Sequence, residues 1–283
     1  MSGTLAHELR LLLGAGVPVA EVVVAVAQGS TPREAGARML VTADAIHGTI
    51  GGGRLEWAAI ERARRLLADG ESEASLAMPL GPESGQCCGG RVRLAIRRAD
   101  GATLAALEAA ERREAQGRPA VLLFGAGHVG REIARALAPL PLRIRWIDPR
   151  PGSFPEPLPA GIDALATERL VEQVREAPAA AAYLVLTHSH ALDFEICAAA
   201  LAREDAGYVG LIGSATKRAR FERAFSALGL PRERVARLVC PIGGDAVRDK
   251  RPAVIAALVA AELLTVYARR EAASSEPELA ATR

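Results

Sequence analysis

The sequence lacks the features that mark secreted and membrane-inserted proteins. Only four of its 283 residues are cysteine, too few for a disulfide framework in a chain of this size, so we expect a reducing compartment. No apolar run reaches the roughly 20 residues that a membrane-spanning helix needs. The first residues carry neither a basic segment nor a long apolar stretch. We therefore predict a cytoplasmic protein without a membrane partner.

An excess of charge of either sign is also lacking. Lysine and arginine total 35 residues against 33 aspartates and glutamates, a balance that provides no electrostatic footprint for nucleic acid. Aromatic residues make up only 4%, whereas half of the residues are hydrophobic, which is typical of a helix-rich α/β protein. The length allows one large domain or two ordinary ones, each with its own core.

A change in the order of strands and helices near residues 117–119 predicts two domains. We expect a smaller N-terminal α/β domain over 1–117, a Rossmann-like domain over 118–270, and a disordered tail over 271–283. The hydrophobic patterns of the first domain predict helices over 5–14, 55–69 and 103–116, and strands over 19–27, 37–41, 45–50 and 91–96. Those of the second predict parallel strands over 120–124, 142–147, 183–187 and 208–212, with helices on both faces of the sheet and a last helix over 253–269.

A glycine-rich turn directly follows the first strand of the second domain. Gly125, Gly127 and Gly130 form a G-x-G-x-x-G pattern between a buried strand and a helix, and Asp148 ends the next strand. In this dinucleotide-binding fingerprint the glycines make the tight turn, let a phosphate approach, and pack the helix on the strand, respectively. Asp148 is placed to accept a ribose hydroxyl, and the helix N-terminus offers N–H groups to a phosphate. The pattern predicts the fold but not NAD, because the same turn holds other phosphorylated ligands.

Two histidines, His188 and His190, follow a later strand of the same domain. Metal binding would need a third ligand that the sequence does not offer, so we favour His190 as a proton shuttle or an anion contact. Ligands of open parallel sheets bind outside the carboxyl ends of the strands. We therefore expect one crevice lined by Gly127, His190 and Ser214.

A further turn, with Gly213, Ser214 and Lys217, opens a basic helix. We interpret it as a second phosphate cradle. The alternative is a solvated helical face, since the charge pattern continues along the helix. Cys240 lies in a turn shaped by proline and glycine and is interpreted as structural.

Two adjacent cysteines, Cys87 and Cys88, precede Gly89 and Gly90 in the first domain. Glycines beside a thiol let the backbone approach a ligand closely, and the neighbouring Arg91 favours the reactive thiolate. Adjacent cysteines are poorly spaced for tetrahedral zinc. The pair indicates a reactive or ligand-facing thiol, with simple burial as small hydrophobic side chains as the alternative.

Together these motifs resemble the XdhC/CoxI family, the accessory proteins that mature xanthine dehydrogenase and related molybdenum hydroxylases. The resemblance covers nearly the whole chain in the expected order. It rests on residues 28–37, 48–56, 86–90, 124–129, 187–190, 210–214 and 240–243, with Asp193. The adjacent pair of cysteines resembles the xanthine dehydrogenase branch, whereas the broader family often carries a single cysteine, at the position of Cys88.

The resemblance implies a carrier rather than an enzyme. Such proteins bind molybdenum cofactor, hold it while a cysteine desulfurase supplies the terminal sulfido ligand, and deliver it to the molybdenum subunit of apo-xanthine dehydrogenase. It implies that Cys87 or Cys88 ligates molybdenum or relays sulfur. On the same reading, the glycine-rich turn and the Ser214 region hold the pterin phosphate, or a nucleotide. The other residues expected to bind the cofactor are Gly89, Gly90, Gly125, Gly127, His128, Gly130, Asp148, His188, His190, Gly213, Ser214 and Lys217.

Two other functions remain open from the residues themselves. An NAD(P)-dependent oxidoreductase with His190 as acid/base would use the fingerprint and Asp148, but it would not need the two cysteines. A redox-sensing scaffold with a Cys87–Cys88 disulfide is disfavoured because such a bridge is strained. A homodimer is expected, since two-fold pairs are the commonest assembly.

Overall fold

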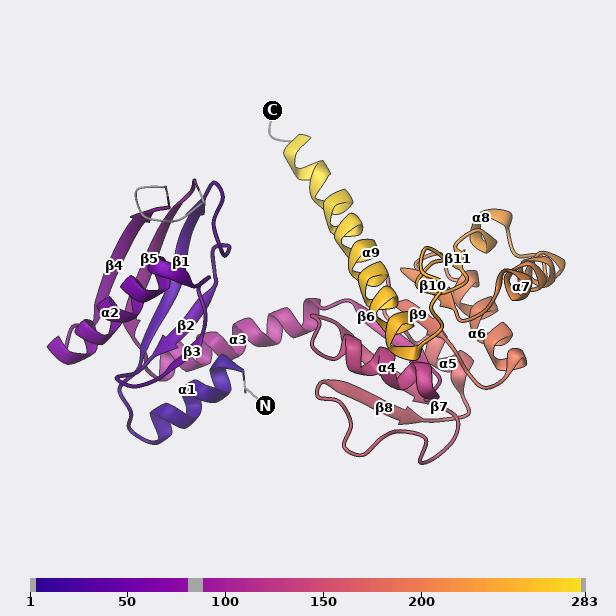
Figure 1. The fold of residues 1–283 in the computed structure, drawn as a ribbon, viewed down its shortest axis with the longest axis horizontal. Helices are drawn as coiled ribbons and strands as arrows, with labels where there is room; N and C mark the ends of the chain where they lie inside the picture. The colour runs from indigo at the N-terminus through magenta and orange to yellow at the C-terminus, as the bar shows by residue number, and fades with distance from the viewer. Residues whose placement is uncertain (1–3, 81–88, 281–283) are drawn as a thin grey trace. The chain divides into compact units, whose positions relative to one another are not determined.

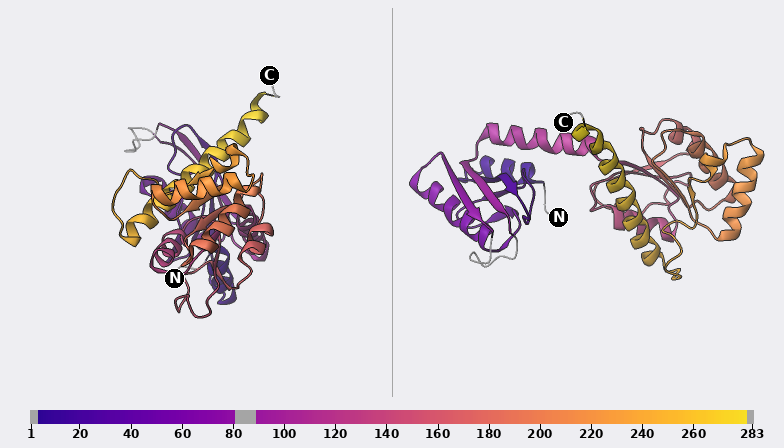
Figure 2. Two further views of the ribbon diagram at one scale, coloured as in Figure 1. Left: turned by 90° about the vertical axis from the view of Figure 1, so that its right-hand side faces the viewer. Right: turned by 90° about the horizontal axis from the view of Figure 1, so that it is seen from above.

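The chain folds into two compact units, Met1–Gln116 and Gly117–Arg283, as Figures 1 and 2 show. The computed structural model describes the backbone of residues 4–80 and 89–280. Cys87 and Cys88 therefore lie outside the described residues. Each unit has its own sheet, antiparallel in the first and parallel in the second. The predicted α/β fold class is confirmed.

The first unit is built on a five-stranded antiparallel sheet. In spatial order its strands are β3 (Ile46–Gly48), β2 (Arg38–Val41), β1 (Ala20–Gln28), β5 (Arg91–Arg98) and β4 (Glu73–Pro79). Burial alternates along β5, where the buried Val92, Leu94 and Ile96 alternate with exposed residues. This period of two is what a strand with one covered face requires.

Helices cover both faces of this sheet. Helix α2 (Gly53–Asp69) crosses one face (Figure 1) and buries one side of its surface against it, through residues that recur every three or four positions. Helices α1 (Leu5–Gly14) and α3 (Gly101–Gly117) contribute to a separate core cluster that includes Leu40. Met39 and Val41, on either side of Leu40, join the α2 cluster instead. The alternation along β2 thus separates two small cores.

The second unit is built on a six-stranded parallel sheet. In spatial order its strands are β11 (Leu238–Val239), β10 (Tyr208–Leu211), β9 (Ala182–Val185), β6 (Ala120–Phe124), β7 (Arg143–Asp148) and β8 (Ile162–Ala166). The chain adds β7 and β8 on one side of β6 and then returns to add β9, β10 and β11 on the other. The order therefore reverses between β6 and β9, the place where doubly wound sheets bind ligands.

Helices cover both faces of the parallel sheet, as predicted. Helices α4 (His128–Leu137) and α9 (Pro252–Ala280) pack on one face, where Val121 and Leu123 of β6 point. Leu122 and Phe124 point to the opposite face. That face is covered by α5 (Leu170–Arg175), α6 (His190–Ala202), α7 (Ala215–Ala227) and α8 (Arg232–Val235).

Several elements differ from the sequence-based expectations. Strand β4, strand β8, helix α8 and the two-residue β11 were not predicted, because short segments of mixed polarity carry little periodic signal. Helix α9 continues to Ala280, so residues 271–280, expected to be part of a disordered tail, are helical.

Helix α9 has a second notable property. Its Pro252–Ala273 portion is long and apolar enough to cross a membrane by length and composition alone, a test that core helices of globular proteins also pass. Here Ala256, Val259, Leu263 and Tyr267 are buried in the core cluster beside the parallel sheet. Packing on the sheet accounts for the apolar character of this side of the helix.

Candidate functional site

The glycine-rich turn after β6 sits at the reversal point of the parallel sheet. Gly125 has a φ of +115°, and a Cβ at this position would lie 2.2 Å from the carbonyl oxygen of Leu186. A Cβ at Gly130 would lie 2.1 Å from the carbonyl oxygen of Gly125. Both positions therefore require glycine, because any side chain would collide with backbone. They bring the start of α4 tightly against the ends of β6 and β9.

Gly127 differs from its two neighbours in the motif. Its φ of −74° is accessible to any residue, and a Cβ there would meet no atom within 4 Å. It is the N-cap of α4 and supplies no capping side chain, so no side chain at this position satisfies the first N–H groups of the helix. His128, the first residue of α4, is exposed beside it. This arrangement leaves room for an anionic group at the helix N-terminus.

Asp148 lies at the end of β7, but its carboxylate points inward. Its side chain is 1% exposed and accepts hydrogen bonds from the backbone N–H of Ala126 at 2.7 Å and from Arg150. Burial alone would raise the pKa of Asp148, but the hydrogen bonds from Arg150 and Ala126 outweigh burial and lower it. The residue predicted to accept a ribose hydroxyl thus fastens the glycine-rich turn instead.

A second part of the site lies at the ends of β9 and β10. A pocket of about 350 Å³ brings together five predicted site residues, namely His188, His190, Gly213, Ser214 and Lys217. His190 is exposed at the start of α6, and the hydroxyl of Ser214 caps α7 by accepting from the N–H of Lys217 at 3.3 Å. Of the three residues expected to line one crevice, His190 and Ser214 line this pocket, whereas Gly127 is not among its lining residues.

An ion pair between two residues lines this pocket. The ammonium group of Lys217 lies 2.6 Å from Asp193 Oδ2 and also donates to the carbonyl oxygen of Ile212 at 3.0 Å. The other oxygen of Asp193 accepts from the N–H and the hydroxyl of Thr187. Both charged side chains are buried or nearly so. Lys217, expected to contact a phosphate, therefore uses its charge to hold the strand ends in place.

In the first unit, three glycine-containing loops meet at one end of the sheet. Gly90 fits so closely against the loop after β1 that a Cβ there would lie 2.5 Å from the carbonyl oxygens of both Gln28 and Ser30. A Cβ at Gly51 would lie 2.5 Å from Cβ of Pro32. Leu80 N–H donates to the carbonyl oxygen of Gly90 at 2.8 Å. These contacts determine where the chain leaves β4 and re-enters β5, on either side of the two cysteines.

Glu56, near the start of α2, fastens the loop that contains Gly51. Its carboxylate accepts from the Thr49 hydroxyl and from the N–H groups of Ile50 and Gly52. Burial tends to raise the pKa of Glu56, but these hydrogen bonds prevail and lower it. The loop shape thus depends on a single side chain that the sequence shows only as one acidic residue among several.

The described cysteines, Cys197 and Cys240, are both buried. Burial raises the pKa of Cys240, and that of Cys197 to well above its usual value. Buried thiols that stay protonated are poor nucleophiles and poor ligands, in agreement with a structural role for Cys240. Within residues 4–80 and 89–280 no three metal-ligating side chains gather into a cluster.

Comparison with known proteins agrees with this architecture. A model of the XdhC Rossmann domain matches residues 121–263, and a model of the XdhC and CoxI family matches residues 12–77. The chain belongs to the XdhC/CoxI family. The two matched segments correspond to the parallel and the antiparallel unit, so the family resemblance predicted from the motifs is confirmed.

Two known proteins are similar to this chain over most of its length. It is 31% identical over 255 residues to the uncharacterized protein YqeB of Escherichia coli (strain K12), a match that covers 88% of this chain and 43% of YqeB. The chain thus spans less than half the length of this curated relative. A crystal structure described as a xanthine dehydrogenase from Bacillus halodurans shares the fold, with a TM-score of 0.77 at 17% identity over 96% of this chain and 98% of that chain.

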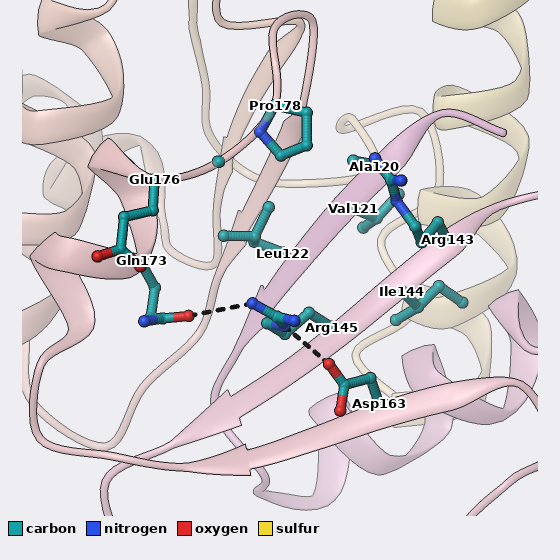
Figure 3. A pocket seen from close by; sticks show the side chains of 11 residues that line it. Ala120, Val121, Leu122, Arg143, Ile144, Arg145, Asp163, Gln173, Glu176 and Pro178 are labelled. Carbon is teal, nitrogen blue, oxygen red and sulfur yellow. Dashed lines mark hydrogen bonds and ion pairs between the residues drawn. The ribbon is translucent and has the colours of Figure 1, made fainter. Parts of the chain in front are cut away.

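A hollow at the opposite edge of the parallel sheet does not belong to this site. It lies at the amino ends of β6 and β7 and has a volume of about 400 Å³. Figure 3 shows Arg145 at its centre, paired with Asp163 at 2.8 Å and bonded to Gln173. Ligands of doubly wound sheets bind at the carboxyl ends instead, so we assign this hollow to packing between α5 and the sheet.

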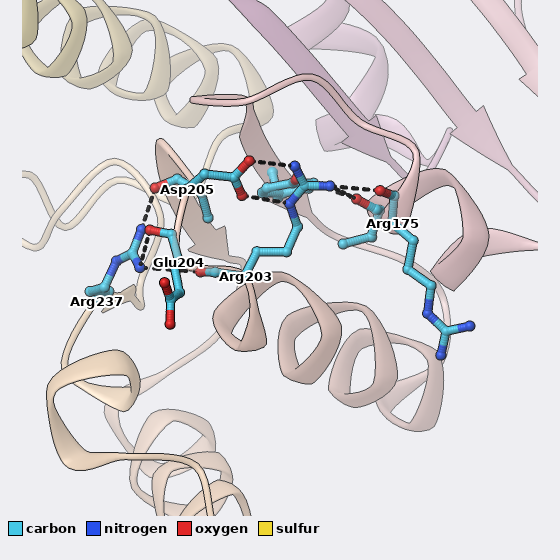
Figure 4. A network of polar contacts seen from close by, with 8 residues as sticks. Arg175, Arg203, Glu204, Asp205 and Arg237 are labelled. Atoms are coloured by element: carbon cyan, nitrogen blue, oxygen red, sulfur yellow. Dashed lines mark hydrogen bonds and ion pairs between the residues drawn. The ribbon is translucent and has the colours of Figure 1, made fainter.

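A polar network also stabilises the amino edge of the sheet (Figure 4). Arg203 makes two hydrogen bonds to Asp205 and donates to the carbonyl oxygens of Val174 and Arg175 at the end of α5. Arg237 donates to carbonyl oxygens of the same turn. Helix ends leave carbonyl groups without intrahelical partners, and the two arginines satisfy some of them.

Proposed function

We propose that this chain is a molybdenum cofactor carrier that acts in the maturation of xanthine dehydrogenase or a related molybdenum hydroxylase. Membership of the XdhC/CoxI family supports a maturation role. The cargo would be molybdopterin-bound molybdenum, held while a cysteine desulfurase supplies the sulfido ligand and then transferred to the apo-hydroxylase. A cytoplasmic location and a homodimer are part of this proposal.

The observation that carries the proposal is the open end of α4. At Gly125 and Gly130, neighbouring backbone atoms leave no room for a side chain or a ligand atom. Gly127, in contrast, has open space beside it at a helix N-terminus without a side-chain cap. A phosphate fits this position because the N–H groups and the helix dipole both favour an anion. Molybdopterin carries a terminal phosphate, so the turn is suited to hold the cargo without acting on it.

Placement of the loops in the first unit supports a role for the thiols. The residues that flank the two cysteines, Leu80 and Gly90, are joined to each other and to the loop after β1. Soft thiolate ligands suit molybdenum and sulfur transfer. We propose that Cys87 or Cys88 contacts the metal or its sulfido ligand.

The oxidoreductase alternative has less support. A bound NAD is expected to place its ribose hydroxyls on the acidic residue at the end of the second strand. Here Asp148 is buried and already bonded to Ala126 and Arg150. The exposed His190 fits an acid/base role, but it fits equally well as a contact of an anionic cargo.

The first test is to identify the small molecule that co-purifies with the protein. The chain is expressed in a host that makes molybdenum cofactor, purified without oxygen, and the extracted ligand is analysed by mass spectrometry. We expect molybdopterin with the native chain and with Cys197→Ala, which removes a buried thiol, but little with Cys87→Ala/Cys88→Ala. A nicotinamide dinucleotide retained equally by all three proteins, with molybdopterin in none of them, would refute the carrier function.

A second test uses the open glycine. Gly127→Ala places a methyl group where the phosphate approaches but touches no protein atom, so folding should be preserved while cofactor retention falls. Gly14→Ala is the matched control. A Cβ at Gly14 also meets nothing within 4 Å, and Gly14 is far along the chain from the glycine-rich turn at residues 125–130. Retention that is equally high in Gly127→Ala and in the control would contradict a phosphate site at α4.

A further inference from the structure

The acceptor positions of Asp148 are all occupied by the protein itself. Oδ1 accepts from the N–H of Arg150 at 3.0 Å and from its Nε at 2.9 Å. Oδ2 accepts from Nη2 of Arg150 at 3.0 Å and from the N–H of Ala126 at 2.7 Å. A carboxylate has about four lone-pair sites. A ribose diol arriving at this strand end would therefore find no acceptor for its two hydroxyl protons.

Arg150 presents the opposite chemistry to the ligand. Its side chain is 49% exposed, although Asp148 beneath it is buried. Of its five guanidinium N–H groups, those on Nη1 and the second one on Nη2 bond to no atom in the described part of the chain. The two hydrogen bonds to Asp148 hold the guanidinium plane in a defined orientation. A fixed, half-exposed guanidinium is a good partner for a phosphate.

We propose that Arg150 determines the ligand specificity of the glycine-rich site by selecting a phosphomonoester and excluding a free ribose diol. The inference rests on the proposed ligand site at α4 and specifies the class of molecule that it takes. The phosphomonoester belongs either to molybdopterin or to a nucleotide phosphorylated on its ribose. Asp148 acts through Arg150: it positions the guanidinium and fastens Ala126 in the turn.

The test compares two probes that differ only at the ribose, NAD+ and NADP+, by titration calorimetry with the full chain. The native chain should bind NADP+ about tenfold more tightly or better. Arg150→Gln removes the charge and frees two acceptor positions of Asp148, so it should reverse the order and favour NAD+. Arg150→Lys keeps a cation beside Asp148 and should shift the ratio in the same direction by a smaller factor, which keeps the test usable if the glutamine variant does not fold.

Three results would overturn the proposal. These are equal affinity of the native chain for the two probes, a ratio that neither variant changes, and no binding of NADP+ by the native chain at millimolar concentration. None of them depends on molybdenum. The carrier function is tested by a different measurement, the retention of molybdopterin. Each of the two proposals can therefore be refuted without the other.

The source of the phosphomonoester is identified with cofactor-loaded protein. If NADP+ displaces the co-purified pterin from the native chain and NAD+ bound to the same occupancy does not, then the pterin phosphate occupies the Arg150 site rather than the start of α4. If both molecules remain bound, the phosphate read by Arg150 belongs to a nucleotide. Release of the pterin is followed by its fluorescence after oxidation.

Discussion

The two units fasten their glycine-rich loops in the same way but with different electrostatics. In each, one carboxylate accepts N–H groups of the loop: Glu56 for residues 49–52 and Asp148 for Ala126. Asp148 is buried and paired with Arg150, and Asp193, which holds Thr187 beside the same sheet, is buried and paired with Lys217. The donors found for Glu56, in contrast, are a hydroxyl and backbone N–H groups.

The difference follows from burial. A carboxylate withdrawn from water needs a counter-charge, because its desolvation is expensive. Glu56, near the start of α2, is only partly buried, so water and neutral donors suffice. We therefore expect the turns of the parallel unit to be rigid and intolerant of substitution, and the loop of the antiparallel unit to be adjustable.

The largest expected effect comes from Gly125→Ala. The added Cβ would collide with the carbonyl oxygen of Leu186 at a φ of +115°, so we expect a loss of about 4 kcal/mol or more in the free energy of unfolding. Gly127→Ala, two residues away, should change it by less than about 1 kcal/mol. Chemical denaturation followed by circular dichroism measures both. Similar losses for the two variants would show that the turn is not held as described.

Lys217→Met tests the buried ion pair. Removing the ammonium group leaves Asp193 buried without its counter-charge, which should cost about 3–5 kcal/mol. The double variant Asp193→Asn/Lys217→Met should recover most of this loss, since an asparagine oxygen still accepts from Thr187. Denaturation midpoints of the two variants measure the coupling. A single variant as stable as the native chain would mean that the pair contributes little.

Glu56→Gln should have a smaller effect. The amide keeps one acceptor oxygen but loses the charge that strengthens its hydrogen bonds, so we expect a loss of about 1 kcal/mol. Glu61→Gln on the same helix is the control, because the Glu61–Arg65 pair is exposed and such pairs contribute little. Hydrogen exchange at the Ile50 and Gly52 amides should accelerate in Glu56→Gln and not in the control.

The smallest expected effect is the response to acid. Because its folded-state pKa is lowered, Glu56 stabilises the loop above its usual pKa of 4.5 and loses this contribution as the pH falls through the folded value. The pKa of Asp148 is likewise lowered from its usual value of 3.8, so Asp148 also loses its stabilising contribution as the pH falls. Exchange at the Ile50 and Ala126 amides, corrected for the intrinsic rate, should therefore rise as the pH falls below these usual values. Exchange that does not change with pH at either amide would contradict the role given to these carboxylates.

Much of the candidate site could be predicted from local patterns. The run Ala120–Phe124 followed by Gly125, Gly127 and Gly130 predicts a buried parallel strand and its turn, because strand burial and glycine geometry are local properties. The hydrogen bonds of Asp148 and Lys217 were not predictable. Both residues match an expected ligand contact by position, but their partners, Ala126 with Arg150 and Asp193, depend on how the chain packs. Strand β4 was not predicted because its residues are small and of mixed polarity. This segment becomes a strand through its pairing with β5, which lies later in the sequence.

The sequence by itself determined the two units, the turn at the reversal point of the parallel sheet, and the family, since each depends on the identity and spacing of neighbouring residues. Tertiary structure alone decided which charged side chains are buried and which stay exposed at the candidate site. Asp148 and Lys217 turn inward because their partners, brought close by folding, compensate the loss of water around a buried charge. Gly127 and Arg150 stay accessible because packing leaves space beside them.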